Sequence, residues 1–131
     1  PGWVERRREI AARYDEAFGS TEATEPLKRR DDATCAYHLY VIRLVLDRLQ
    51  ADRKTLFEAL QAEGIGVNVH YIPVHLQPHY RENLGTEPGL CPNAEAGYER
   101  ILTLPVFPRM TDSDVEDVIR AVRKVVSTYR R

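Results

Sequence analysis

Long apolar runs, paired cysteines and an excess of one charge are all missing from this sequence of 131 residues. No apolar stretch approaches the roughly 20 residues that a membrane-spanning helix needs, and the first residues lack the apolar core of a secretory signal. Cys35 and Cys91 lie far apart in a chain long enough to have its own core, so we expect free thiols rather than a disulfide framework. These absences favour a cytoplasmic protein without a membrane partner.

The charge balance excludes another class of partner. Acidic and basic residues number 20 and 19, and the formal net charge is −1. This balance provides no general attraction to nucleic acid or to an anionic membrane, and we expect neither. The length suits one domain but is short for an enzyme with its own cofactor site. Because the chain begins at Pro1 without methionine, we expect residues 1–131 to be one small domain of a longer protein.

Catalytic signatures are also scarce. The sequence has no Gly-rich phosphate-binding loop of either common pattern. Its lysines lie in a polar loop and on predicted helices, where nothing marks one of them as a reactive amine. Three histidines and Cys91 offer zinc-ligand types, but their spacing lacks the close pairs of structural zinc sites, so we expect no metal. The residues concerned are Lys28, Lys54, Lys124, His70, His75 and His79.

Hydrophobic periodicity predicts helices alternating with strands. We expect a helix from Trp3 to Phe18 that ends at Gly19, and a second helix over 52–63 with Asp52 as its N-cap and Gly64 as its left-handed stop. The last helix starts after a cap at Thr111 and carries an apolar stripe over 115–129. The other predictions are strands over 36–44, through Val67 and Val69, and over 101–105, a short helix over 93–100 capped by Asn93, and loops over 20–33 and 73–92.

These elements predict an α+β fold. Three strands form a small sheet, antiparallel or mixed, and the helices pack on one of its faces. The stripe of the last helix is expected to face the sheet.

The most informative segment is the end of the strand through Val67 and Val69. There the chain enters a loop stiffened by Pro73 and Pro78 and rich in imidazoles and phenols. Such groups both donate and accept hydrogen bonds, which suits a polyhydroxylated ligand. The competing interpretation is that a surface loop carries these residues without a function. The residues in question are His70, Tyr71, His75, His79 and Tyr80.

Two segments, residues 64–80 and 99–111, together resemble the C-terminal part of the PLP-dependent sugar aminotransferases of the DegT/DnrJ/StrS family. Residues 7–14 are similar to the segment that leads from the large domain of that family into its small domain. Within the family, the pattern His70-Tyr71-x-Pro73-x-His75 is most similar to that of enzymes that aminate UDP-linked keto-deoxysugars at carbon four. The resemblance covers nearly the whole chain and is weakest over residues 20–34.

The resemblance implies that this chain is the C-terminal domain of a fold-type I PLP enzyme. His75 becomes the first candidate for contacting the sugar or its phosphate, and His70 and Tyr71 come second. His79 stands where relatives have a tyrosine-like residue, so the resemblance gives it no role. The lysine and aspartate that hold PLP belong to the large domain, which is not part of this sequence. This chain alone is therefore expected to contribute no catalytic residue and to bind no PLP.

The full enzyme would take an amino group from glutamate and transfer it to a nucleotide-linked keto-deoxysugar, acting as a homodimer. Two other hypotheses stay open. The chain could be a free-standing α+β module that binds a sugar or another small molecule, or an interaction domain that docks through its last helix. A longer gene with an upstream lysine-containing PLP domain favours the enzyme. Solution mass at several concentrations tests the interaction domain.

Overall fold

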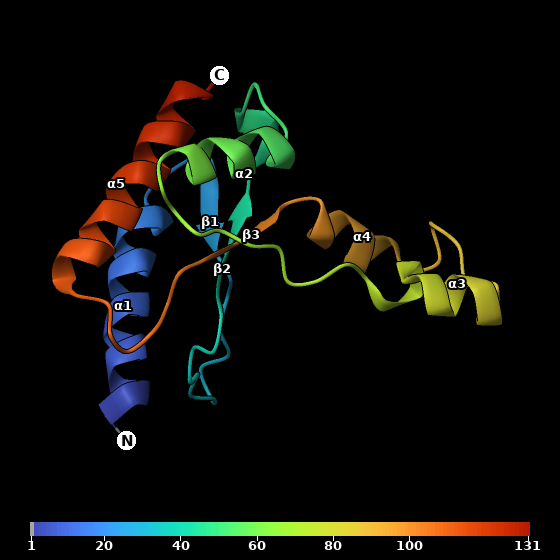
Figure 1. Cartoon of the computed structure of the whole chain (residues 1–131), viewed down its shortest axis with the longest axis horizontal. Helices are drawn as coiled ribbons and strands as arrows, with labels where there is room; N and C mark the ends of the chain where they lie inside the picture. Colours follow the sequence, from blue (N-terminus) through green and yellow to red (C-terminus); the bar gives the residue numbers. More distant parts are fainter. Residues whose placement is uncertain (1) are drawn as a thin grey trace.

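The computed structural model describes residues 2–131 as a three-stranded sheet with two long helices on one side and a helical arm on the other (Figure 1). The predicted α+β class is confirmed, and the sheet is antiparallel throughout, in the order β1-β2-β3. In chain order the elements are α1 (Gly2–Gly19), β1 (Thr24–Pro26), β2 (Tyr40–Leu44), the 3-10 helix η1 (Leu46–Arg48), α2 (Arg53–Ala62), the 3-10 helix η2 (Val74–Leu76), α3 (Pro78–Leu84), α4 (Pro92–Tyr98), β3 (Ile101–Leu104) and α5 (Asp112–Thr128).

The central strand β2 has one buried side and one side that is partly open. Tyr40, Ile42 and Leu44 are buried, whereas Arg43 between them is exposed. This is the alternation expected of a strand covered on one face. The register places Ile42 opposite Leu102 of β3, so the buried residues of both strands form one apolar surface.

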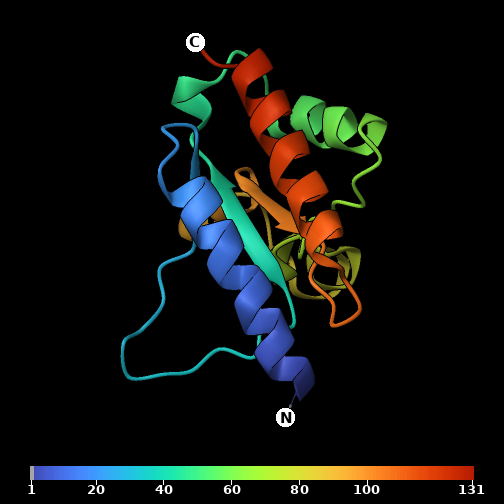
Figure 2. The ribbon, with the colours of Figure 1, turned by 90° about the vertical axis from the view of Figure 1, so that its left-hand side faces the viewer.

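Helices α1 and α5 cover that apolar surface side by side (Figure 2). In α1 the buried residues follow helical spacing, and in α5 six of the seven residues of the predicted stripe are buried, all except Tyr129. The Tyr14 hydroxyl, deep in the core, donates a 2.9 Å hydrogen bond to the carbonyl oxygen of Pro105. Burial raises the pKa of Tyr14, so this phenol stays a neutral donor. The buried residues of α1 are Ile10, Ala11, Tyr14, Ala17 and Phe18.

Several predicted helix boundaries are confirmed by their capping contacts. Asp52 accepts a hydrogen bond from the Thr55 amide at the start of α2. Gly64 ends that helix with a φ of 80°, a conformation that favours glycine. Thr111 and Asp114 form a reciprocal capping box at the start of α5. Local sequence signals therefore correctly predicted the start and the end of α2 and the start of α5.

The predicted strand through Val67 and Val69 is wrong. Only Asn68 pairs with the sheet, in an isolated antiparallel bridge to Thr103 of β3. Ile65 and Val67 are nevertheless buried in the core. The alternating pattern therefore predicted correctly that these side chains are buried. A β-strand also needs a partner strand to pair with along its length, and here the chain turns away from β3 after one bridge.

Two predicted loops contain regular structure. Residues 20–33, predicted as a loop, include β1, and residues 73–92 include η2 and α3. The predicted strand over 36–44 is shorter, because Tyr37 adopts a positive φ of 48° and the ladder begins at Tyr40. The short helix α4 begins at Pro92, so Asn93 lies inside the helix and is not its N-cap. The N-cap residue is Cys91, whose side chain makes no capping hydrogen bond. Proline at the first helical turn explains this start.

Two further expectations concern the cysteines and the lengths of the apolar helices. Cys35 and Cys91 are both exposed, free thiols, as predicted. Among residues 2–131, no helix has the length and apolar character that crossing a bilayer requires.

The one-sided core generates a first prediction. Ile42 is completely buried between the sheet and its helices, whereas its neighbour Val41 lies on the opposite, partly open face. Ile42→Ala should lower the free energy of unfolding by about 2–5 kcal/mol, because it leaves a cavity in the core. Val41→Ala, the matched control, should cost clearly less. Guanidinium unfolding of both variants is the measurement, and equal losses would contradict a single covered face.

Candidate functional site

The candidate site lies on the arm, which we define as residues 70–100. The arm leaves the sheet at Asn68 and returns to it at β3, and Asn68 and Thr103 exchange two backbone hydrogen bonds of 3.1 and 2.8 Å where the two ends meet. Within the described chain, the apolar core includes no residue between Val67 and Leu102. The arm thus projects from the open side of the sheet (Figure 1).

His70 and Tyr71 lie at the base of the arm. The Nδ1 atom of His70 is 3.0 Å from the Oγ1 atom of Thr103, a threonine buried on the open face of β3. The rings of His70 and Tyr71 meet edge to face, with centroids 4.6 Å apart. Tyr71 itself is 68% exposed. The structure therefore brings these two predicted site residues together, with His70 held and Tyr71 pointing to solvent.

His75, the third predicted site residue, is buried inside the arm. Its Nε2 atom lies 2.8 Å from Oε1 of Glu95 on α4, and its carbonyl oxygen accepts a 2.6 Å hydrogen bond from the Thr86 hydroxyl. Only 7% of His75 is exposed. One of the two ring nitrogens is thus already bound to protein, and the residue joins η2 to α4 and to the loop between α3 and α4.

Glu95 is the centre of this part of the arm. Besides His75, its carboxylate accepts hydrogen bonds from the Gly89 amide at 2.8 Å and from the Cys91 amide at 3.3 Å. The hydrogen bond from His75 lowers the pKa of Glu95, and the bonds from Gly89 and Cys91 lower it further. We call this set of contacts the Glu95 anchor. It holds η2, the following loop and α4 in one arrangement.

A second contact joins the C-terminal end of α4 to helix α2. The guanidinium of Arg53, on α2, stacks over the ring of Tyr98 at 4.7 Å from the centroid. Figure 1 shows α4, which ends at Tyr98, between the sheet and α3, and α3 at the outer end of the arm. The arm is therefore attached at both ends and braced internally.

Two further polar residues of the predicted loop lie apart from this set. His79 contacts Asn83 one turn along α3, through its backbone oxygen at 2.8 Å. The rings of His79 and Tyr80 meet edge to face, and both residues are exposed. Among the described residues, no contact joins the side chain of His79 or Tyr80 to His70 or Tyr71.

Sequence reasoning missed Glu95, Thr86 and Thr103. Each is an ordinary polar residue whose importance depends on a partner 11 to 33 residues away. For Glu95 a weak signal was present: a carboxylate in the first turn of a predicted helix can accept amide bonds from the loop before it. Nothing in the spacing identified His75 as its partner.

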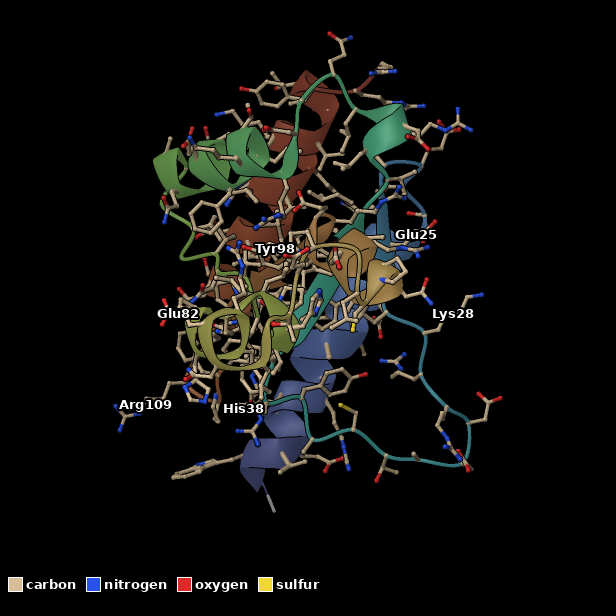
Figure 3. All side chains as sticks on the ribbon, turned by 90° about the vertical axis from the view of Figure 1, so that its right-hand side faces the viewer. Glu25, Lys28, His38, Glu82, Tyr98 and Arg109 are labelled. Carbon is tan, nitrogen blue, oxygen red and sulfur yellow. The ribbon has the colours of Figure 1, made fainter. Side chains whose placement is uncertain are left out.

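The residues present do not fit a PLP site. Lys54 and Lys124 pair with Glu58 and Glu63 on the surface, and Lys28 extends into solvent on an exposed loop (Figure 3). A lysine that attaches PLP needs a pocket with a phosphate cradle, which these positions lack. Nor does any group of three or more metal-ligating side chains occur in the part of the chain that the structure describes. The arrangement can offer hydrogen bonds and shape to a ligand.

The Glu95 anchor generates a prediction about pH. The folded-state pKa of Glu95 lies below its ordinary value of 4.5, so the anchor's stabilisation is complete above that value and is lost as the pH falls through the lowered pKa. The amide proton resonance of Gly89 should report this loss directly. We expect its NMR titration midpoint below 4.5 in the native chain and no such transition in Glu95→Gln.

The matched control is Glu99→Gln, one helical turn further along, where the carboxylate is exposed. This variant should leave the Gly89 titration unchanged. A Gly89 midpoint at or above 4.5 in the native chain, or one that survives in Glu95→Gln, would contradict the anchor.

Comparisons with known proteins agree on one family. The profile of the DegT/DnrJ/EryC1/StrS aminotransferase family matches residues 1–123. The protein MJ1066 of Methanocaldococcus jannaschii is 44% identical over 125 residues, which cover 95% of this chain and 32% of MJ1066. The spore coat polysaccharide biosynthesis protein SpsC of Bacillus subtilis is 42% identical over 122 residues, which cover 92% of this chain and 31% of SpsC.

A solved structure shows the same shape. Spr1654 of Streptococcus pneumoniae, a proposed sugar aminotransferase solved in PLP and PMP forms, superimposes with a TM-score of 0.87 at 30% identity, covering 98% of this chain and 32% of its own. The chain spans about a third of the length of each of these relatives. Since the family profile matches all but the last eight residues, this chain belongs to the DegT/DnrJ/EryC1/StrS aminotransferase family.

Proposed function

We propose that this chain is the small C-terminal domain of a longer PLP-dependent sugar aminotransferase, and that its arm covers the substrate. The longer enzyme would transfer an amino group from glutamate to a nucleotide-linked keto-deoxysugar in polysaccharide biosynthesis. The observation that carries the proposal is that a member of an aminotransferase family presents Tyr71 and His70 on a braced arm but has no lysine suited to PLP. That SpsC is a spore coat polysaccharide biosynthesis protein and Spr1654 a proposed sugar aminotransferase supports the pathway and a sugar substrate.

In this proposal the cofactor site lies in the large domain, outside residues 1–131. The residues of this chain bind and orient the sugar nucleotide and exclude water from it. That the longer enzyme is a cytoplasmic homodimer stays a prediction.

The three predicted substrate residues take different parts. Tyr71 offers an exposed hydroxyl, and His70, oriented by Thr103, supports the base of the same loop. The sequence placed His75 first, but its Nε2 atom is bound to Glu95 in a buried position. We therefore propose that Tyr71 and His70 contact the sugar nucleotide, and that His75 acts by positioning the loop that carries them.

The prediction is that Tyr71→Phe, in the longer polypeptide, lowers kcat/KM for the keto sugar by about 2- to 10-fold. That is the loss expected from one neutral hydrogen bond of about 0.5–1.5 kcal/mol. The reaction with glutamate should be unchanged, because this hydroxyl is assigned to the sugar. Stopped-flow measurement of the glutamate and sugar half-reactions separately is the test.

Tyr80→Phe is the matched control, since Tyr80 is another partly exposed phenol of the arm. His75→Ala and His75→Gln extend the same assay. If His75 positions the loop, alanine should impair use of the sugar and glutamine, which can still donate to Glu95, should restore much of it. Equal losses in both half-reactions for Tyr71→Phe would contradict the proposed role of Tyr71 in binding the substrate. A native polypeptide that lacks an upstream PLP domain would contradict the proposed function as a whole.

A further inference from the structure

Arg53 carries a buried polar atom that hydrogen bonding does not explain. Among the described residues, the Nε atom of Arg53 is buried and has no hydrogen-bond partner. Burying an unpaired donor costs free energy, so a side chain keeps such a position only where another contact compensates. Here the compensating contact is the stack of the guanidinium over the Tyr98 ring, 4.7 Å from its centroid. The structure therefore holds Arg53 in this stack rather than in full solvation.

The α2 side of the stack is rigid. Arg53 is the first residue of α2, and Asp52 before it caps the helix by accepting hydrogen bonds of 2.8 and 2.7 Å from the amide and hydroxyl of Thr55. Leu56, three residues into the helix, is completely buried in the core. The core thus holds α2, and α2 holds the guanidinium at a fixed place beside the arm.

The α4 side of the stack has less support. Within the described residues, α4 buries none of its side chains, so apolar packing does not fix its direction. Tyr98 ends this short helix, and Glu95 lies three residues before it, so both move together. Glu95 in turn holds His75 of the preceding loop. A continuous line of contacts therefore runs from Arg53, through α4 and the Glu95 anchor, to the loop that carries Tyr71.

We propose that Arg53 is a positioning residue for the sugar substrate. Its stack on Tyr98 sets the direction in which the arm leaves the domain, and so places Tyr71 against the sugar nucleotide. This inference rests on the proposed function. Figure 1 shows α3 beyond α4, so a small tilt of α4 displaces the outer part of the arm further. Because Arg53 acts through Tyr98, its removal should weaken use of the sugar without changing the reaction with glutamate.

Steady-state kinetics of the longer native polypeptide that contains this chain test the role. The probe is a UDP-linked keto-deoxysugar with its ketone at carbon four. Arg53→Ala should raise KM for this sugar about 3- to 10-fold and leave kcat within about 2-fold, because misalignment weakens binding of the ground state and the transition state alike. The half-reaction with glutamate should be unchanged. Lys54→Ala, the matched control, removes the next cation of α2, which pairs with Glu58, and should change neither constant.

Variants of Tyr98 distinguish the stack from a general loss of stability. Tyr98→Phe keeps a ring under the guanidinium and should retain most of the native affinity for the sugar. Tyr98→Leu removes the ring and should raise KM as Arg53→Ala does. Arg53→Lys keeps the charge but not the planar group, so it should recover only part of the loss. Arg53→Ala combined with Tyr98→Leu should be no worse than either change alone, and effects that multiply would overturn the proposal.

A measurement on the 131-residue chain tests the geometry without catalysis. The two exposed thiols, Cys35 outside the arm and Cys91 beside α4, can each take a nitroxide label. Pulsed electron resonance then reports the distribution of distances between the arm and the rest of the domain. Arg53→Ala should broaden this distribution, and Lys54→Ala should not. Equal widths in the native chain and in Arg53→Ala would overturn the proposal and leave the proposed function standing.

The remaining outcomes are also decisive. A broader distribution with an unchanged KM for the sugar would make the stack purely structural and would overturn the positioning role. A longer native polypeptide that holds no PLP, or that does not aminate the keto sugar, would overturn the proposed function and this inference together.

Discussion

The burial of one face of the β1-β2-β3 sheet against α1 and α5 is the interaction on which the rest of the structure depends. A sheet of three short strands is stable only with a covered apolar face, and the two long helices supply that cover. Tyr14 illustrates how the layers are joined: its ring packs against those of Phe18 and Tyr40, and its hydroxyl reaches the chain just after β3. The strands, and therefore the point where the arm starts, take their positions from this layer.

The opposite face of the sheet is where the arm begins. Because the helices occupy one side, Thr103 on the other side is free to receive His70 and the Asn68 bridge. The arm thus starts from a rigid strand but extends beyond the core. If the arm binds the substrate as proposed, this division separates stability from recognition: substitutions in the core should affect folding, and substitutions on the arm should affect binding.

Elements specified by local signals were predictable from sequence. The helix α5 carries both a capping box and a long apolar stripe, and α2 lies between Asp52 and Gly64, so short-range chemistry defines both. The strand β1 was not predictable, because three residues in a polar segment form a strand only through pairing with β2. The Glu95 anchor was missed for the same reason, since its contacts join residues far apart in sequence. The candidate site segment was selected from a local feature, imidazoles and phenols gathered beside two prolines, and its role as a binding site stays a prediction.

The central proposal is that this chain supplies structure and substrate contacts, while the cofactor is held by another part of a longer enzyme. The most direct test is to mix the 131-residue chain with equimolar PLP, treat it with borohydride and map the products by mass spectrometry. The account predicts only slight, unselective labelling of the surface lysines, Lys28, Lys54 and Lys124. Stoichiometric labelling of one of these lysines, lost on its mutation to alanine, would contradict the account.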